Sequence, residues 1–328
     1  MNKIKHLYFL IIVLLAACGA NVAPTPVVPT GTPIPPKGTP VPAIDTPIPS
    51  SPAAIQGNRL TLTLAPGVTL ELVRVPAGQF LMGSADSETD AISAAQPQSK
   101  TPLDEYWISK YDVTNAQFAA FVQATGYKTT AEQRGSSYVK DGISWKSTPG
   151  ANWQHPRGPN STISGKDNYA VVQISWDDAV AFCAWASKTT GRQIKLPSEA
   201  QWEKAARGTD DRLYPWGNQA PDATRLNFNG NVGDTTEVGK YSPLGDSPYG
   251  AVDMAGNVWQ WTSSLYKPYP YNATDGREDA SSREGRVFRG GGFHDVGARY
   301  VRSAYRDANT PDDRADDRGF RVVAYATP

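Results

Sequence analysis

The sequence contains little cysteine and little histidine, and it carries no net charge. Among 328 residues there are 2 cysteines and 3 histidines, while 32 Lys and Arg side chains are balanced by 32 Asp and Glu. So few cysteines exclude a disulfide-dense scaffold and an all-cysteine zinc or iron–sulfur site. So few histidines argue against a multi-histidine metal centre. Because there is no basic excess, we expect no nucleic acid partner.

Long apolar runs are also scarce, and the clearest one lies at the N-terminus. A short basic start precedes an uninterrupted apolar run, Leu7–Ala17, that is too short to span a bilayer as a helix. This pattern is typical of a secretory leader, and its end, Leu-Ala-Ala-Cys at 15–18, resembles the bacterial lipobox. We therefore expect residues 1–18 to be a lipoprotein signal peptide and Cys18 to be lipidated. The mature protein would be secreted across the cytoplasmic membrane and held at the cell envelope by this lipid anchor.

Proline is concentrated in the next segment. Between Pro24 and Pro52, 11 of 29 residues are proline. A chain of this composition is short of backbone donors and core-forming side chains, and it stays extended at about 3.1 Å per residue. We expect residues 19–56 to be a disordered linker and residues 57–328 to form a single folded domain.

Hydrophobic periodicity in the domain predicts few helices. They are expected over 113–122, 175–186 and 198–207, with Thr114, Ser175 and Ser198 in capping positions. In the second helix, the expected buried stripe is Trp176, Val180, Cys183 and Ala184.

The other elements are expected to be short strands and loops. Strands are predicted over 60–64, 68–75, 79–82 and 319–325. The stretch 214–271 is rich in Gly, Pro, Asn and Asp, which predicts a long loop region. A loop region of this length needs internal ties, such as metal ions or Trp packing.

Seven phrases occur in an order that is similar to one known family. They are Pro76–Ser84, Lys110–Asn115, Leu196–Gly208, Tyr214–Asn218, Asp253–Trp261, Arg289–Gly292 and Gly319–Arg321. In that order they resemble the formylglycine-generating enzyme, or sulfatase-modifying factor, domain. The resemblance implies an α+β fold, a loop-rich variant of the C-type lectin fold with few helices and short strands, over residues 57–328.

The resemblance also implies a chemistry whose residues are missing. Aerobic enzymes of that family bind copper(I) through two cysteines shortly after the glycine turn and oxidise a substrate cysteine to formylglycine. Here the stretch 292–306 contains no cysteine, and matching without gaps puts Asp295 and Tyr300 near the two thiolate positions. Copper(I) prefers soft thiolates. Since Cys183 is expected to be a buried thiol within a helix, we expect copper to be absent from this protein's function.

Calcium is the cofactor that the resemblance favours. In the family, one ion is held by a loop whose positions match Asp253, Gly256, Val258 and Gln260, although Gln260 replaces a usual Glu. A second family site matches Asn227, the Phe228 carbonyl and Asp234. Oxygen ligands of this mixed type suit calcium, whereas ordinary Asx turns would explain the same residues without an ion.

Candidate catalytic residues come from segments that line the substrate groove in the family. They are His155, His294, Asp295 and Arg302. His294 and Asp295 are adjacent, and adjacent residues on an extended strand point to opposite faces, so a general-base pair would need a bulge. Arg299 and Arg302 are expected to form ion pairs with the acid-rich run 312–317.

These expectations favour one function and leave two open. The favoured function is a membrane-tethered, extracytoplasmic module that binds a peptide, protein or glycan without copper-dependent cysteine oxidation. One alternative is an enzyme with another oxidative tailoring chemistry that uses His155 or His294. The other is residual formylglycine-generating activity or help in sulfatase maturation. Whether the protein is an enzyme therefore stays open at this point.

Overall fold

The computed structural model describes residues 54–88 and 91–325. The signal peptide, Cys18 and most of the expected linker lie outside the described residues. The last residues of that linker, Ala54–Gln56, form a strand, so the folded part begins slightly earlier than expected. None of the helices in the described ranges is long and apolar enough to cross a bilayer.

The described chain combines four α-helices with many short strands. The elements are β1 (Ala54–Gln56), β2 (Arg59–Ala65), β3 (Val68–Val75), β4 (Gly78–Met82), η1 (Ser93–Ala95), β5 (Ser99–Leu103), β6 (Tyr106–Ser109), α1 (Asn115–Thr125), α2 (Thr130–Arg134), β7 (Ser136–Asp141), β8 (Ser144–Pro149), α3 (Trp176–Thr190), β9 (Ile194–Lys195), α4 (Glu199–Arg207), β10 (Trp259–Leu265), β11 (Arg286–Arg289), η2 (Ala298–Val301), β12 (Arg306–Asn309), β13 (Arg318–Phe320) and β14 (Val323–Ala324). This confirms the expected α+β, loop-rich class.

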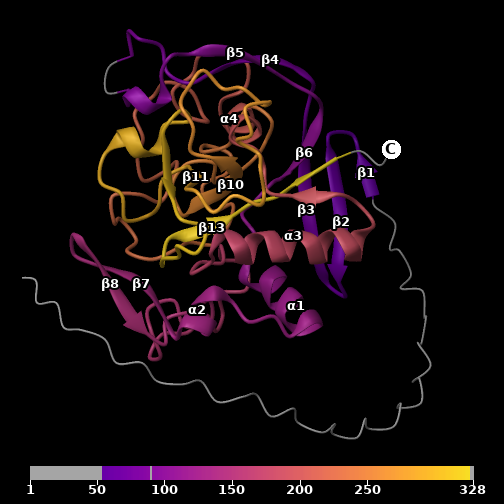
Figure 1. Ribbon diagram of the computed structural model, residues 1–328, viewed down its shortest axis with the longest axis vertical. Coiled ribbons are helices and arrows are strands. Elements are labelled where there is room, and N and C mark those ends of the chain that lie inside the picture. Colours follow the sequence, from indigo (N-terminus) through magenta and orange to yellow (C-terminus); the bar gives the residue numbers. More distant parts are fainter. Residues whose placement is uncertain (1–53, 89–90, 326–328) are drawn as a thin grey trace, which may run out of the picture. The chain divides into compact units, whose positions relative to one another are not determined.

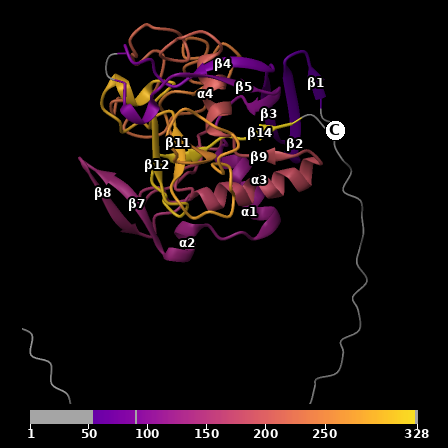
Figure 2. The same cartoon turned by 45° about the horizontal axis from the view of Figure 1, so that its top comes forward.

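The strands form two larger sheets and two hairpin-like pairs. The first sheet has the order β1-β2-β3-β6-β14-β9, and the second has the order β12-β11-β10-β13. β4 pairs with β5, and β7 pairs with β8. Figures 1 and 2 both show the β7–β8 hairpin extending outward from the helices and the second sheet.

The helices begin where the sequence predicts. Thr114, Ser175 and Ser198 each accept a hydrogen bond from the backbone N–H three residues later, which completes a capping box at α1, α3 and α4. The short helix α2 was not expected. Thr129 caps it in the same way, but a helix of five residues leaves almost no periodic pattern to detect.

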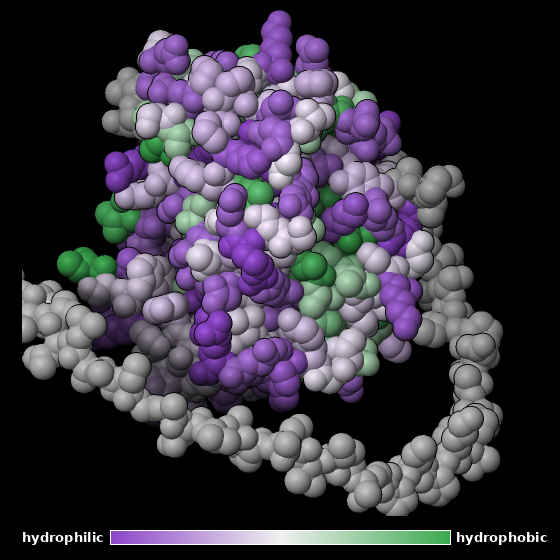
Figure 3. All heavy atoms as spheres, viewed as in Figure 1, coloured by the Kyte–Doolittle hydropathy of each residue, from purple (hydrophilic) through white to green (hydrophobic). Residues whose placement is uncertain are grey.

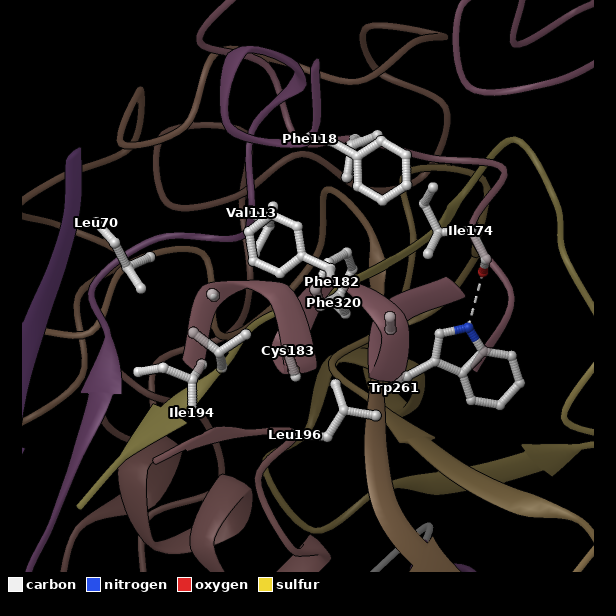
Figure 4. Close-up of a cluster of buried hydrophobic side chains, with 14 of the residues drawn as sticks. Leu70, Val113, Phe118, Ile174, Phe182, Cys183, Ile194, Leu196, Trp261 and Phe320 are labelled. Atoms are coloured by element: carbon white, nitrogen blue, oxygen red, sulfur yellow. Dashed lines mark hydrogen bonds between the residues drawn. The ribbon is translucent and has the colours of Figure 1, made fainter. Parts of the chain in front are cut away.

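The expected buried stripe of α3 is wrong in part. Val180 and Ala184 are exposed, and Ala179 and Ala186 are buried together with Trp176 and Cys183. Those four follow the 3-4-3 spacing that keeps side chains on one helix face. The remaining core residues include Phe118, Phe182, Ile194, Leu196 and Phe320, and Figure 4 shows Cys183 beside Ile194 and Leu196.

The last predicted strand is divided between the two sheets. β13 pairs in parallel with β10, whereas β14 pairs with β6 and β9 of the other sheet. The chain changes sheet at the fully buried Arg321, whose guanidinium donates to the Gln260 amide oxygen at 2.6 Å. The predicted loop 214–271 is also interrupted, because β10 lies within it.

Candidate functional site

The candidate site is built on the loop between β11 and β12, residues 290–305, called here the site loop. Its glycine turn lies against the starts of β10 and β13. A Cβ atom on Gly292 would lie 2.8 Å from an Asp317 carboxylate oxygen and 3.0 Å from the Trp259 ring. Only glycine permits this approach without rearrangement, so the turn places the site loop directly over Asp317 and Trp259.

Asp295, one of the two residues expected near the thiolate positions, folds back onto this turn. Its carboxylate accepts a hydrogen bond from the Gly292 N–H at 2.8 Å. Burial raises the pKa of Asp295 above its usual range, although that bond and the Arg318 charge act in the opposite direction. The Asp295 carboxylate therefore stabilises the glycine turn through this hydrogen bond and also faces the site.

Asp317 is a second buried acid beside Asp295. One of its oxygens accepts from the Arg318 guanidinium at 2.8 Å, while the other has no hydrogen-bond partner among the described residues. Burial raises the pKa of Asp317 to about 7, although the Arg318 charge lowers it; the neighbouring charges of Asp295 and Asp316 raise it further. An acid with a pKa near neutrality can hold or release a proton at physiological pH. No sequence motif had indicated Asp317 individually.

His294 is not paired with Asp295. Its Nε2 atom lies 3.2 Å from the Asp316 carboxylate, and its ring packs on Phe293 with centroids 4.0 Å apart. Trp145, from β8, meets the His294 ring edge to face at 5.8 Å. The β7–β8 hairpin thus contributes directly to the site, which sequence reasoning did not foresee.

Tyr300, the other residue expected near a thiolate position, lies in η2 rather than in an extended strand. Its ring is 5.1 Å from the ring of Tyr305, which in turn is 6.0 Å from Trp259. Asp295 and Tyr300 both act electrostatically on Tyr305, whose pKa rises mainly through burial. The structure therefore places both Asp295 and Tyr300 near Tyr305.

The structure gives Arg299 and Arg302 other partners than the ones expected in residues 312–317. Arg302 pairs with Glu88 at 2.7 Å, and the Arg299 guanidinium lies over the Tyr300 ring at 4.6 Å. The acid-rich run is instead matched by Arg318, which pairs with Asp313 and Asp317. The reason is that Ala298–Val301 form the η2 turn, in which side chains do not alternate between two faces as they would in a strand.

His155 lies in a neighbouring turn and makes a local contact. Its Nδ1 atom lies 2.5 Å from the Ser161 carbonyl oxygen. The same turn reaches the site through Arg157, whose guanidinium lies 3.7 Å from Asp316 and stacks over Phe293. Within the described ranges, no contact joins His155 to the site-loop histidine, so the candidate set does not form one catalytic group.

Cys183 is buried in the middle of α3, as expected for a structural thiol. Burial raises its pKa well above the usual range, so it stays protonated. Cys183 is also the only cysteine in the described residues. In the described part of the chain, no thiolate pair is formed.

Two residues of the first calcium set, Asp253 and Gln260, already accept hydrogen bonds from the protein. The Gln260 amide oxygen accepts from the Trp202 indole at 2.7 Å and from Arg321 at 2.6 Å. The Asp253 carbonyl accepts from Gln260 at 2.8 Å, and the Asp253 carboxylate accepts from the Gly239 N–H. A guanidinium thus supplies positive charge to the loop that holds Asp253, Gly256, Val258 and Gln260. This arrangement does not fit a cation bound through Gln260.

In the second calcium set, one oxygen atom is suited to binding a cation. The side-chain oxygen of Asn227 is buried without a hydrogen-bond partner, while its amide nitrogen donates to the Asp234 carbonyl at 2.8 Å. The Phe228 carbonyl accepts from Asn231, and the Asp234 carboxylate pairs with Lys166 at 2.7 Å. An unpaired buried oxygen suits a hard cation. Across residues 54–88 and 91–325, no group of three or more His, Cys, Asp and Glu residues is arranged to hold a metal.

Exposed apolar side chains lie on the site loop and on the two segments that contact it, the β7–β8 hairpin and the loop around Asn229. Ile143, at the tip of the β7–β8 hairpin, is 96% exposed, and Val296, in the site loop itself, is 75% exposed. The loop that carries the exposed Val232 is tied to the site loop by a hydrogen bond from the Asn229 N–H to the Asp295 carbonyl at 2.9 Å. We call Ile143, Trp145, Val232 and Val296 the apolar rim.

A polar hollow of about 520 Å³ opens between the hairpin and the segment 309–318. Its lining joins the two exposed aromatics of the hairpin, Tyr138 and Trp145, to guanidinium groups of which Arg318 is shared with the site. Arg318 stacks on Phe288 at 4.1 Å and connects the hollow to Asp317. The arrangement offers aromatic faces, cations and acids on one surface.

Comparison with known proteins places this fold in a family. The model of the sulfatase-modifying factor enzyme 1-like domain matches residues 65–326, and the chain belongs to this family. It is 34% identical to the formylglycine-generating enzyme of Mus musculus, over 80% of each chain. It is also 34% identical to the inactive C-alpha-formylglycine-generating enzyme 2 of Bos taurus, covering 81% of this chain and 91% of that one. Among solved structures, PvdO from Pseudomonas aeruginosa aligns with a TM-score of 0.65 and 25% identity, covering 81% and 98% of the two chains.

Proposed function

We propose that this protein is a membrane-tethered, extracytoplasmic member of the family that binds a peptide or protein segment and does not oxidise cysteine with copper. The observation that carries the proposal is the absence of cysteine from residues 292–306, where gapless matching from the glycine turn puts Asp295 and Tyr300 near the positions of the family's two thiolates. A carboxylate and a phenol offer hard oxygen atoms, which are poor ligands for copper(I).

The named relatives indicate that proteins with this fold need not share one activity. The relatives include formylglycine-generating enzymes and also proteins whose name describes them as inactive, at the same level of identity. Function within one fold depends on the site residues rather than on the scaffold. In this chain the described part supplies no second thiol that would complete a copper site.

The apolar rim supports peptide or protein recognition. Exposed apolar side chains gathered around a polar centre are typical of interaction surfaces. Ile143 and Trp145 come from the hairpin, and Val296 comes from the site loop, so one ligand can contact both elements. The acids and guanidinium groups between them provide partners for backbone amides and charged side chains.

Copper chemistry is tested with the wild-type protein and the double variant Asp295→Cys/Tyr300→Cys. Copper(I) affinity is measured by competition with a chromogenic chelator, and a Cys-x-Pro-x-Arg peptide is incubated with each protein in air and analysed by mass spectrometry. We expect no stoichiometric copper and no formylglycine product with the wild type, and tight copper binding by the double variant. Copper binding or product formation by the wild type would overturn the proposal.

Ligand recognition is tested by peptide display. Peptides enriched on the wild-type protein should lose at least tenfold in affinity on Trp145→Ala or Ile143→Asp, since these residues belong to the apolar rim. The matched control is Ile55→Asp, which changes an exposed isoleucine on β1, outside the rim. Equal losses with the control, or binding to a glycan array in place of peptides, would contradict peptide recognition at this surface.

Tethering is tested by metabolic labelling with an alkyne fatty acid in a bacterial host. Label and membrane association should disappear in Cys18→Ser and persist in Cys183→Ser, which removes the other cysteine of the sequence. A soluble, unlabelled wild-type protein would contradict the lipid anchor.

A further inference from the structure

A second hollow shares no residue with the site loop. Its volume is about 570 Å³, within the range of small-molecule sites, and it lies between α3, β9, the start of α4 and the segment 271–280. The residues that line it include Val180, Ala184, Leu196, Tyr271 and Glu278.

Most of the wall is apolar. It includes the side of α3 that the sequence analysis had expected to be buried, with Val180 and Ala184 facing the hollow instead of the core. Leu196 and Tyr271 form other parts of the wall. Figure 3 shows hydrophobic residues gathered over the position that α3 occupies in Figure 1. This surface has room for a ring-sized apolar group.

One carboxylate is held in a fixed position at this wall. Glu278 accepts hydrogen bonds from the hydroxyls of Ser263 and Ser264, and from the Tyr271 hydroxyl at 3.2 Å. Burial, together with the Glu278 charge, raises the pKa of Tyr271, so this phenol remains a donor. Three hydroxyl donors orient the carboxylate but do not neutralise its charge.

The balance of charge at the hollow is negative. Its lining contains three carboxylates, Asp104, Glu105 and Glu278, and one ammonium group, Lys195. Lys195 lies over the Tyr325 ring at 6.0 Å, and Glu105 pairs with Arg74 at 2.6 Å.

The two guanidinium groups near Glu278 are engaged elsewhere. Arg277 pairs with Asp275 at 2.8 Å, and Arg286 donates to the Ser263 carbonyl at 2.7 Å. Neither residue belongs to the lining. Glu278 therefore remains the charge that a ligand in the hollow would meet.

We propose that this hollow is a binding site for a small amine with an aromatic or similarly sized apolar body, whose cationic group pairs with Glu278. The apolar wall of α3 and Leu196 would cover the body of the ligand. An anionic ligand would face the carboxylates of Asp104 and Glu278, and a neutral one would leave the charge of Glu278 without a countercharge in the hollow. This site is independent of the function proposed for the site loop.

The experiment uses three probes that share one carbon skeleton: 3-phenylpropan-1-amine, 3-phenylpropan-1-ol and 3-phenylpropionate. Binding to the full protein is followed by ligand-observed NMR and calorimetry at neutral pH. We expect the amine to bind about tenfold more tightly than the alcohol, a ratio typical of a charge-assisted hydrogen bond, and the carboxylate to bind most weakly. Equal binding of all three probes, or no binding of the amine, would overturn the proposal.

Two variants locate the site, and one serves as a control. Glu278→Gln should lower amine affinity about tenfold and leave the alcohol unchanged. Ala184→Trp should block all three probes by filling the hollow, whereas Lys188→Trp, at an exposed position one turn along α3 and outside the lining, should not. Amine binding that survives Ala184→Trp would place it elsewhere. A change of oligomeric state in Ala184→Trp, measured by sedimentation, would show that a second copy covers this surface and would overturn the proposal.

Discussion

The protonation of Asp317 gives a sharp prediction for the pH dependence of stability. Its carboxyl is buried, lies beside other acids and has one oxygen without a hydrogen-bond partner, and all three features favour keeping the proton. In the folded protein its pKa is about 7 against an ordinary value of 3.8. The variant Asp317→Asn keeps the shape and removes the titration. The amide oxygen can still accept from Arg318, which also retains its pairing with Asp313.

The sign follows from counting protons in the two states. Between about pH 4 and pH 7 the unfolded chain has released this proton and the folded chain has kept it, so the free energy of unfolding decreases as pH rises through this window. Above pH 7 both states are ionised, and the contribution becomes constant. A raised pKa of this size corresponds to on the order of 4 kcal/mol between the two ends of the window.

Urea unfolding of the wild type and the variant at pH values from 4.5 to 8.5 measures this contribution. The wild-type stability minus that of Asp317→Asn should fall with rising pH, and the variant should be the more stable protein at the upper end. Asp313→Asn removes another carboxylate next to Arg318 and should keep the wild-type slope. If the wild type and Asp317→Asn change in parallel, Asp317 is not protonated in the folded state and the reasoning is wrong.

Three further predictions concern the scaffold. Ser175→Ala should lower the free energy of unfolding by about 1 kcal/mol, measured by urea unfolding, because it removes the α3 cap. Gly256→Ala should cost more than ~2 kcal/mol in the same assay, because its Cβ would lie 2.5 Å from the Asn227 carbonyl, whereas Gly250→Ala has open space and should cost less. If calcium binds the Asn227 oxygen, chelation should lower the melting temperature of the wild type and leave that of Asn227→Ala unchanged. A wild-type melting temperature that is insensitive to chelator and to added calcium would contradict this last expectation.

The helices could be predicted because their signals are local. A Ser or Thr cap followed by a periodic apolar pattern needs only neighbouring residues, and all three expected helices begin at their predicted caps. The division between β13 and β14 could not be predicted in this way. It depends on the buried contacts of Arg321, whose partners lie far away in the sequence.

Several parts of the candidate site also depended on distant contacts. The sequence indicated Asp295 and Tyr300 by their spacing from the glycine turn, and the structure brings both beside Tyr305. It gave no sign that Trp145 would pack on His294, because the hairpin reaches the site from 149 residues earlier in the chain. It also misassigned Arg302, since the η2 turn directs this side chain to Glu88.

The family motifs identify the scaffold rather than the chemistry, and the buried charges show why. Arg289 pairs with Glu203 at 2.6 Å and with Glu199 at 3.2 Å, and all three side chains are fully buried. Removing one partner of such a cluster would leave an uncompensated charge, at a cost of about 3–5 kcal/mol. These residues therefore resist change whatever the site does. Asp295 and Tyr300 lie on the loop that follows Arg289, outside this cluster, so residues of the loop can change while the motifs, and the fold they hold, persist.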